Sequence, residues 1–331
     1  MKRALLGRLG LYRLACLMAV ICGAALAGLY PVRGAWAQEI RGVVLLPDSV
    51  PVAKAVVELH RVTEQTGALV DSATTDASGR FVFSFEDEVE SGTVYLGAAR
   101  HDGILYWGEP VHSTMSQDAL DSYTVLVYDT LVVAGPDTGL RTAIRHVVVT
   151  PAMSGLQVEE IIDVEGLPDR TVVGEADTIA VWIAPLASGA HGVVPSAAGV
   201  AAEDLIVTGE QIGYVGPLPP SGIRVVIQYV IPSSDYVLSL PSETGRLELL
   251  VMPVPGLDLT VSGLEESAVS GDMRVPVRRF SGLDLAAGSS ISVRTTIEQP
   301  GKYRVWPWFV ASFVLGAAAL VSVKMSSRHR V

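Results

Sequence analysis

Two apolar stretches bracket this chain and decide which part of it can fold in water. One extends over residues 14–30 behind four basic residues, and the other extends over residues 305–323. The later stretch has 19 residues, and as a helix it would be about 28 Å long, close to the hydrocarbon thickness of a bilayer. The sequence therefore predicts a transmembrane helix at 305–323, with Trp306 and Trp308 at the outer interface. A buried core helix is the alternative, and the absence of a polar stripe in 309–323 disfavours it.

The first apolar stretch has the features of a secretory signal. The start is basic, the core is uncharged, and the small-residue triplet Ala35-Trp36-Ala37 precedes Gln38. We expect a signal peptide at 1–37 that is cleaved after Ala37. The positive-inside rule places the basic tail 324–331 in the cytoplasm and exports residues 38 to about 301, into the periplasm or the extracellular space. An uncleaved leader would leave the same orientation, because its flank is basic too.

The exported part is strongly acidic. The chain has 24 Lys and Arg and 35 Asp and Glu, and residues 1–37 and 302–331 each contain five basic and no acidic residues. The part between them therefore has 14 basic and 35 acidic groups, a formal net charge of −21. A field of this sign repels phosphates, so a nucleic-acid partner is disfavoured.

Both cysteines lie in the leader. They are Cys16 and Cys22, so a chain cleaved after Ala37 has no thiol. This excludes a disulfide framework, cysteine zinc sites and thiol catalysis in the exported part. Its stability must come from packed cores, and about 260 residues are enough for two ordinary domains.

Residues 38–130 show short β-branched and aromatic runs separated by turn residues. The turn signals recur about every ten to fifteen residues, which is typical of an all-β sandwich, and no amphipathic helix is evident. The strands expected in this part are 43–46, 56–62, 81–85, 93–96 and 123–128.

Three segments in this part resemble a known family. They are GVV at 42–44, PVAKAVVEL at 51–59 and TDASGRFVF at 75–83, and together they are similar to the carboxypeptidase regulatory-like domain. The resemblance implies a small, seven-stranded, transthyretin-related sandwich over 38–130. It implies little about function, because this module is attached to many unrelated proteins.

The residues of the third segment also predict a turn by themselves. The carboxylate of Asp76 can cap the turn, and Gly79 supplies a position with positive φ. Phe81 and Phe83 lie two residues apart, so we expect both rings in the core.

A linker at 136–139 precedes a second β-rich sandwich region at 140–300. Residues 257–297 either complete this sandwich or form a separate stalk. The expected fold is thus all-β, with tandem Ig-like or transthyretin-like sandwiches between a signal peptide and one transmembrane helix. The strands expected in the second region are 145–149, 156–163, 178–184, 204–207, 222–230, 236–240, 246–251, 257–261, 273–280 and 290–296.

Catalytic motifs are missing from the sequence. No histidine has the glutamate spacing of a zinc hydrolase, so the peptidase chemistry that the family's name suggests is not expected. A Gly-x-Ser-x-Gly elbow, a P-loop and a dinucleotide fingerprint are also absent. We expect no enzyme and no cofactor.

Two loop regions contain residue types that bind metals. His101 and His112, with Asp102 and Glu109, could gather around an ion, although ordinary exposed loop histidines are the simpler interpretation. The acidic run 86–90 could bind calcium, but it lacks the spacing of a dedicated loop, and a solvated hairpin tip is favoured. No metal site is therefore predicted.

Tyr106 and Trp107 are the candidate ligand-binding residues. Exposed aromatic rings on a sandwich can stack on sugars, but a position of Trp107 in the core is the favoured interpretation.

The leading functional expectation is a non-catalytic, single-pass, membrane-anchored envelope protein. Its exported β-sandwich domains would mediate interaction with an envelope protein or have a structural role. The alternative is a surface-tethered carbohydrate-binding module that uses Tyr106 and Trp107. A metal-dependent enzyme at the loops of His101 and His112 is a third hypothesis.

Overall fold

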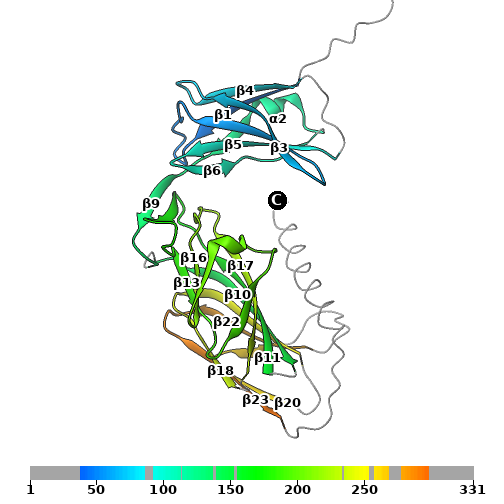
Figure 1. The fold of residues 1–331 in the computed structure, drawn as a ribbon, viewed down its shortest axis with the longest axis vertical. Coiled ribbons are helices and arrows are strands. Elements are labelled where there is room, and N and C mark those ends of the chain that lie inside the picture. Colours follow the sequence, from blue (N-terminus) through cyan, green and yellow to red (C-terminus); the bar gives the residue numbers. More distant parts are fainter. Residues whose placement is uncertain are drawn as a thin grey trace, which may run out of the picture. The chain divides into compact units, whose positions relative to one another are not determined.

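The computed structural model is almost entirely β-structure (Figure 1), as predicted. It describes residues 38–85, 92–112, 114–136, 139–152, 155–232, 235–252, 257–267 and 277–297. The predicted signal peptide, the acidic run 86–90, the anchor 305–323 and the tail 324–331 lie outside these ranges. Within them, no helix has the length and apolar character needed to cross a membrane.

The chain divides into two compact units. Among the described residues, the first unit contains those of 38–100 and 105–127, and the second contains those of 101–104 and 128–297. Each is described separately below, for its described residues.

The first unit is built from two sheets. One has the strand order β4-β1-β8 and the other has the order β3-β2-β5-β6, with β7 paired to β5. The two inner faces meet in one core, where the Tyr123 hydroxyl of β8 accepts a hydrogen bond from the Gly97 amide of β5 at 3.1 Å. The strands are β1 (Gln38–Leu45), β2 (Val56–Val62), β3 (Gly67–Thr74), β4 (Arg80–Phe85), β5 (Val94–His101), β6 (Ile104–Trp107), β7 (Val111–His112) and β8 (Tyr123–Leu126).

The turn before β4 has the predicted construction. Asp76 Oδ1 accepts hydrogen bonds from the amides of Ser78 at 2.8 Å and Arg80 at 2.9 Å, and Gly79 has φ 73°. These hydrogen bonds lower the pKa of the Asp76 carboxyl from its ordinary value. Phe81 and Phe83 are both buried, which confirms the expectation that they enter the core.

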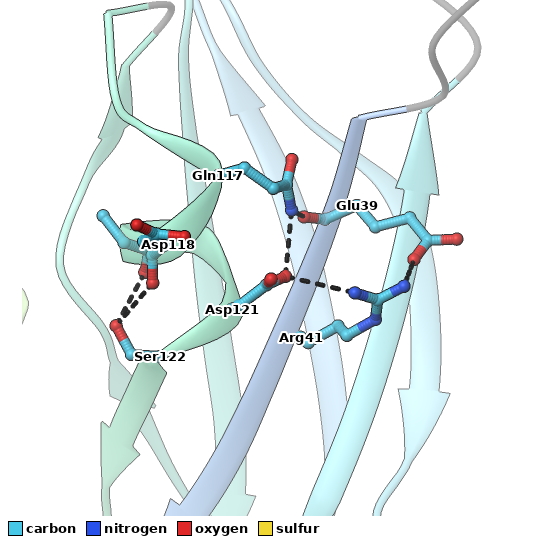
Figure 2. Close-up of polar contacts among 7 residues, drawn as sticks. Glu39, Arg41, Gln117, Asp118, Asp121 and Ser122 are labelled. Atoms are coloured by element: carbon cyan, nitrogen blue, oxygen red, sulfur yellow. Dashed lines mark hydrogen bonds and ion pairs between the residues drawn. The ribbon is translucent and has the colours of Figure 1, made fainter.

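A short helix, α2 (Gln117–Asp121), lies against β1 and was not predicted. Figure 2 shows how its polar side chains hold it there. Gln117 Nε2 donates to the Glu39 carbonyl at 2.8 Å and to Asp121 Oδ1 at 2.9 Å. Arg41 pairs with Glu39 and, at 3.4 Å, with Asp121. Five residues with one buried side chain, Leu120, are too few to show a helical period.

The second unit contains a seven-stranded sheet and three smaller sheets. The large sheet has the order β14-β17-β11-β10-β19-β22-β21, and the smaller ones are β13-β16-β15, β18-β23-β20 and β12-β9. The bounds are β9 (Asp129–Val133), β10 (Thr142–Ala152), β11 (Gly155–Val164), β12 (Arg170–Gly174), β13 (Trp182–Pro185), β14 (His191–Pro195), η1 (Ala202–Asp204), β15 (Leu205–Thr208), β16 (Gln211–Tyr214), β17 (Ile223–Ile231), β18 (Asp235–Ser239), β19 (Thr244–Val251), β20 (Leu257–Ser262), β21 (Glu265–Ser267), β22 (Arg278–Leu285) and β23 (Ser290–Ile297).

The described residues of 257–297 belong to this second unit and do not form a separate stalk. Strand β22 pairs with β19 in the large sheet, and β23 lies between β18 and β20. Ile291 and Val293 of β23 are buried in the core of the unit. Of the two alternatives, the structure therefore supports the one in which these residues complete the second β-rich region.

A buried ion pair lies in the core of the second unit. Arg145 of β10 and Glu160 of β11 are both almost inaccessible, and Arg145 Nη2 lies 2.6 Å from Glu160 Oε2. The Tyr229 hydroxyl donates to the same carboxylate, and Arg145 donates to the Pro185 carbonyl at 3.2 Å. The two charges are thus paired and hydrogen-bonded, as burial requires.

Candidate functional site

The two candidate aromatic residues point to opposite faces of their sheet. Tyr106 is only 7% exposed and belongs to the core, whereas Trp107 is 52% exposed. Successive side chains of a strand alternate between its faces, so one of the two must face outward. The preferred prediction of Trp107 in the core was wrong, and Tyr106 is too deeply buried to form a stacking surface together with it.

A tight turn sets the position of Trp107. Strands β5 and β6 are joined by Asp102 and Gly103, which have φ values of 48° and 81°. A two-residue turn of this kind determines the register of a hairpin, and this register places Trp107 opposite Ala98 of β5. Ala98 is fully buried although it lies on the outer face, as expected beside a large indole ring.

A polar group of β2 and β5 contacts the indole through His60. The His60 ring packs edge-on against Trp107, with ring centroids 4.9 Å apart. His60 Nε2 also lies 3.0 Å from Glu58 Oε2, and Arg100 donates to Glu58 Oε1 at 3.3 Å. The hydrogen bond with His60, followed by the interactions with Arg100, lowers the pKa of the Glu58 carboxyl. Charged and aromatic groups are therefore held next to an exposed indole.

Apolar side chains extend this surface toward the edge of the sheet. The register aligns Leu69 of β3, His60 of β2 and Leu96 of β5 in one row, and Leu69 is 56% exposed. We call the outer side of this sheet the Trp107 face. The side chains that define it are Val56, Glu58, His60, Leu69, Leu96, Arg100 and Trp107.

Strand β3 forms the edge of the Trp107 face. Seven of its eight residues are exposed, and in the part of the chain that the structure describes it pairs with β2 alone. The register shifts at the bulge between Leu59 and His60, where Val70 is the additional residue of β3. An exposed edge of this length offers a row of backbone groups to another chain.

The four residues of the candidate metal loops, His101, Asp102, Glu109 and His112, are not gathered together. His101 and Asp102 lie with Asp129, and one ligand atom of each lies within 4.8 Å of the others. This is the only group of three or more such residues among the described ranges, and it does not include His112 or Glu109. His112 is on β7, opposite Val94. The sequence could not indicate Asp129, because it lies 28 residues from His101 and only the fold brings the two together.

The residues of this group already have structural partners. His101 Nε2 lies 3.0 Å from Asp129 Oδ1, and Asp102 Oδ2 accepts from the amide of Thr130 at 3.3 Å and from its hydroxyl at 3.4 Å. His101, Asp102, Asp129 and Thr130 all belong to the second unit. These contacts attach residues 101–104 to the start of β9.

A charged cluster lies on the second unit's large sheet. The Glu248 carboxylate pairs with three side chains. Its Oε1 lies 3.0 Å from Arg246 Nε and 2.5 Å from Arg279 Nη2, and its Oε2 lies 3.4 Å from His146 Nδ1. The hydrogen bond with His146, together with that from Arg279, lowers the pKa of Glu248 to about 2, against the opposing effect of burial. Glu248 therefore stays ionised through ordinary pH and fixes the side chains around it.

Comparisons with known proteins give no family. No family model matches the sequence, and a search of curated proteins gives no match. Solved structures with partial similarity include a Parabacteroides distasonis protein proposed to be a protease, with 10% identity and a TM-score of 0.29 over 49% of this chain and 41% of that chain. An M1 zinc metallopeptidase from Deinococcus radiodurans has 10% identity and a TM-score of 0.27 over 48% of this chain and 43% of its own. This chain thus spans about two fifths of their length.

Proposed function

We propose that this chain is a non-catalytic, single-pass membrane protein whose exported β-sandwich domains bind a protein of the envelope. In this proposal, 1–37 is a signal peptide, 38–130 is a sandwich of the carboxypeptidase regulatory-like type, 140–300 is a second sandwich, and 305–323 is the anchor. The two bracketing apolar stretches and the lack of catalytic motifs in the sequence support it.

The observation that carries the proposal is the Trp107 face. A large aromatic ring and an exposed leucine lie on the outer side of one sheet, next to an ordered group of Glu58, His60 and Arg100. Aromatic anchors surrounded by polar groups are typical of protein interfaces. A face of this composition is the best candidate surface in the described part of the first unit.

Photo-crosslinking in intact cells tests this function. A photoreactive residue would replace Leu69 in the full chain, and the matched control would replace Val82, which is 50% exposed on the other sheet of the same unit. We expect one reproducible crosslinked envelope protein from position 69 after purification from membranes, and none from position 82. The absence of a crosslink in repeated trials, or equal products from both positions, would contradict the proposal.

The second candidate function is a surface-tethered carbohydrate-binding module. It is favoured by one observation, the 52% exposure of Trp107, because an exposed indole can stack on a sugar. A glycan array with the full chain in detergent should then give saccharide binding that Trp107→Ala removes and Val82→Ala does not. Since both side chains are half exposed, each variant should keep the unfolding temperature of the parent. Unchanged binding by Trp107→Ala would reject this candidate.

A further inference from the structure

We infer that β3 accepts an extended segment of the partner as an additional strand, and that this segment presents a basic side chain to Asp71. The inference rests on the proposed function and specifies its partner: an extended, apolar and basic peptide segment. Its evidence comes from the backbone direction of β3, its exposed side chains and the contact of Asp71.

The hydrogen bonds made toward β2 show which backbone groups of β3 point the other way, away from the sheet. The Thr75 amide donates to the Ala55 carbonyl at 3.0 Å, so it points toward β2. Amides alternate in direction along an antiparallel strand, and those of Thr74 and Ser72 therefore point away from β2. At the other end, the Thr63 amide bonds the Thr66 carbonyl at 2.8 Å, and the same alternation turns the polar groups of Leu69 outward.

The side chains of β3 provide apolar area beside these groups. Leu69 is 56% exposed and Val70 is 44% exposed, in the middle of the strand. The strand has neither proline nor lysine, and its protection as an edge comes from Asp71 and from the bulge at Val70. An added strand could cover Leu69 with its own side chains while it pairs with the backbone.

Asp71 controls access to this edge. Its Oδ1 accepts a hydrogen bond from the Ser72 amide at 2.7 Å, which is one of the outward amides. An incoming strand must displace this carboxylate before it can pair at Ser72. A basic side chain on the partner would draw the carboxylate away and compensate its charge, whereas an acidic one would meet repulsion.

Charge also selects a foreign partner over a second copy of this chain. Strand β3 has one charged residue, Asp71, near its centre, so antiparallel pairing of two copies would bring two carboxylates close together. The acidic balance of the exported part adds to this repulsion. The complementary occupant is therefore basic.

Fluorescence anisotropy with synthetic strands tests the inference on the full chain in detergent micelles. The probe is a labelled peptide of about ten residues that alternates Lys and Val, a length that matches one strand. The controls are a Glu and Val peptide of the same pattern and a Lys and Val peptide in which every amide is N-methylated. We expect both controls to bind at least about tenfold more weakly, the first through charge and the second through lost backbone donors.

An Asp71→Asn variant isolates the role of the carboxylate. It should bind the Lys and Glu peptides within about twofold of each other, because the backbone edge remains and the charge preference is gone. The matched control is Asp118→Asn, which removes the same charge from α2 of the same unit and should keep the tenfold preference. Retention of the preference in Asp71→Asn, equal to that in Asp118→Asn, would show that only overall charge acts, and would overturn the inference.

Hydrogen exchange locates the added strand. On addition of the Lys and Val peptide, the amides of Leu69 and Thr74 should exchange more slowly, and those of edge strand β15 in the second unit should not change. Protection elsewhere without protection of β3, equal binding of the N-methylated peptide, or self-association through β3 would each overturn the inference. The crosslinking at Leu69 could still find a partner in that case, so the failure of strand addition is distinct from failure of the proposed function.

Discussion

At the scale of single residues, the buried pair of Arg145 and Glu160 makes stability sensitive to the loss of either partner. Both side chains lie in an apolar core, and each is the main compensation for the charge of the other. Removal of one partner leaves a buried, uncompensated charge, which is more costly than removal of both. The Tyr229 hydroxyl and the Pro185 carbonyl share the same network.

A double-mutant cycle at equilibrium measures the coupling between Arg145 and Glu160. Glu160→Leu and Arg145→Met should each lower the free energy of unfolding by about 3–5 kcal/mol because each leaves a buried charge without its partner, and the double variant should lower it by less. Urea denaturation followed by circular dichroism provides the values. Glu266→Gln, in the exposed pair with Arg278, should have a much smaller effect. Additive single losses in the double variant would show that the pair is not coupled.

The lowered pKa of Glu248 predicts how the stability of the folded chain depends on pH. Its pKa falls from 4.5 to about 2 in the folded chain, so folding favours the ionised carboxylate. The resulting stabilisation is fully present above pH 4.5 and is lost as the pH falls from 4.5 toward 2. A shift of this size corresponds to an upper bound of about 3 kcal/mol.

Denaturation of Glu248→Gln between pH 3 and 7 measures this effect. The variant should be less stable than the parent at pH 7, and the difference should shrink as the pH approaches 3. Glu159→Gln is a control of opposite sign, because burial raises the pKa of Glu159 and makes its charge unfavourable. That variant should match or exceed the parent at pH 7. A difference for Glu248→Gln that does not vary with pH would contradict the assigned role.

At the scale of the elements, the packing of the first unit depends on a glycine in β1. A Cβ on Gly42 would lie 2.3 Å from Cζ of Phe81, and two further atoms of the same ring would lie within 2.9 Å. The aromatic ring thus occupies the space that a larger residue would need. Phe81 and the glycine that receives its ring are 39 residues apart in sequence, and the pairing of strands β1 and β4 brings them together.

Gly42→Ala should therefore destabilise the first unit through overpacking. We expect a loss of about 1–3 kcal/mol in the free energy of unfolding, measured by thermal or urea denaturation. Gly67→Ala is the matched control, because a Cβ at that position meets no atom within 4 Å. It should leave stability unchanged or raise it slightly. Equal stability of Gly42→Ala and the parent would mean that Phe81 can move at little cost.

The strands also show which features a local sequence pattern can predict and which it cannot. Strand β2 was predicted with its observed bounds, Val56–Val62, because its side chains alternate and are bounded by turn residues. Strand β3 was not predicted, because exposed residues on both faces of an edge leave no alternation to detect. Trp107 was favoured for the core because its hydrophobicity does not reveal which face a hairpin turn will give it.

At the scale of the whole molecule, the two described units are acidic, cysteine-free and built from β-sheets between two apolar stretches. The proposed export and anchoring of this body depend on the stretch at 305–323. A chain truncated after residue 301 should appear in the soluble fraction, whereas the full chain should stay with membranes. Protease added to spheroplasts should digest the body of the full chain. Complete protection, or a soluble full chain with its C-terminus intact, would contradict the predicted orientation.

The sequence by itself determined the all-β class, most strands, the Asp76 turn and the acidic, cysteine-free composition of residues 38–301, because these depend on alternation, turn chemistry and composition within short segments. Tertiary structure decided which side of a sheet Trp107 occupies, that β3 is an exposed edge, that Asp129 rather than His112 lies beside His101, and that Arg145 meets Glu160 in a core. Those outcomes depend on strand register and sheet order. Both are set by contacts between residues far apart in the chain, which no local pattern contains.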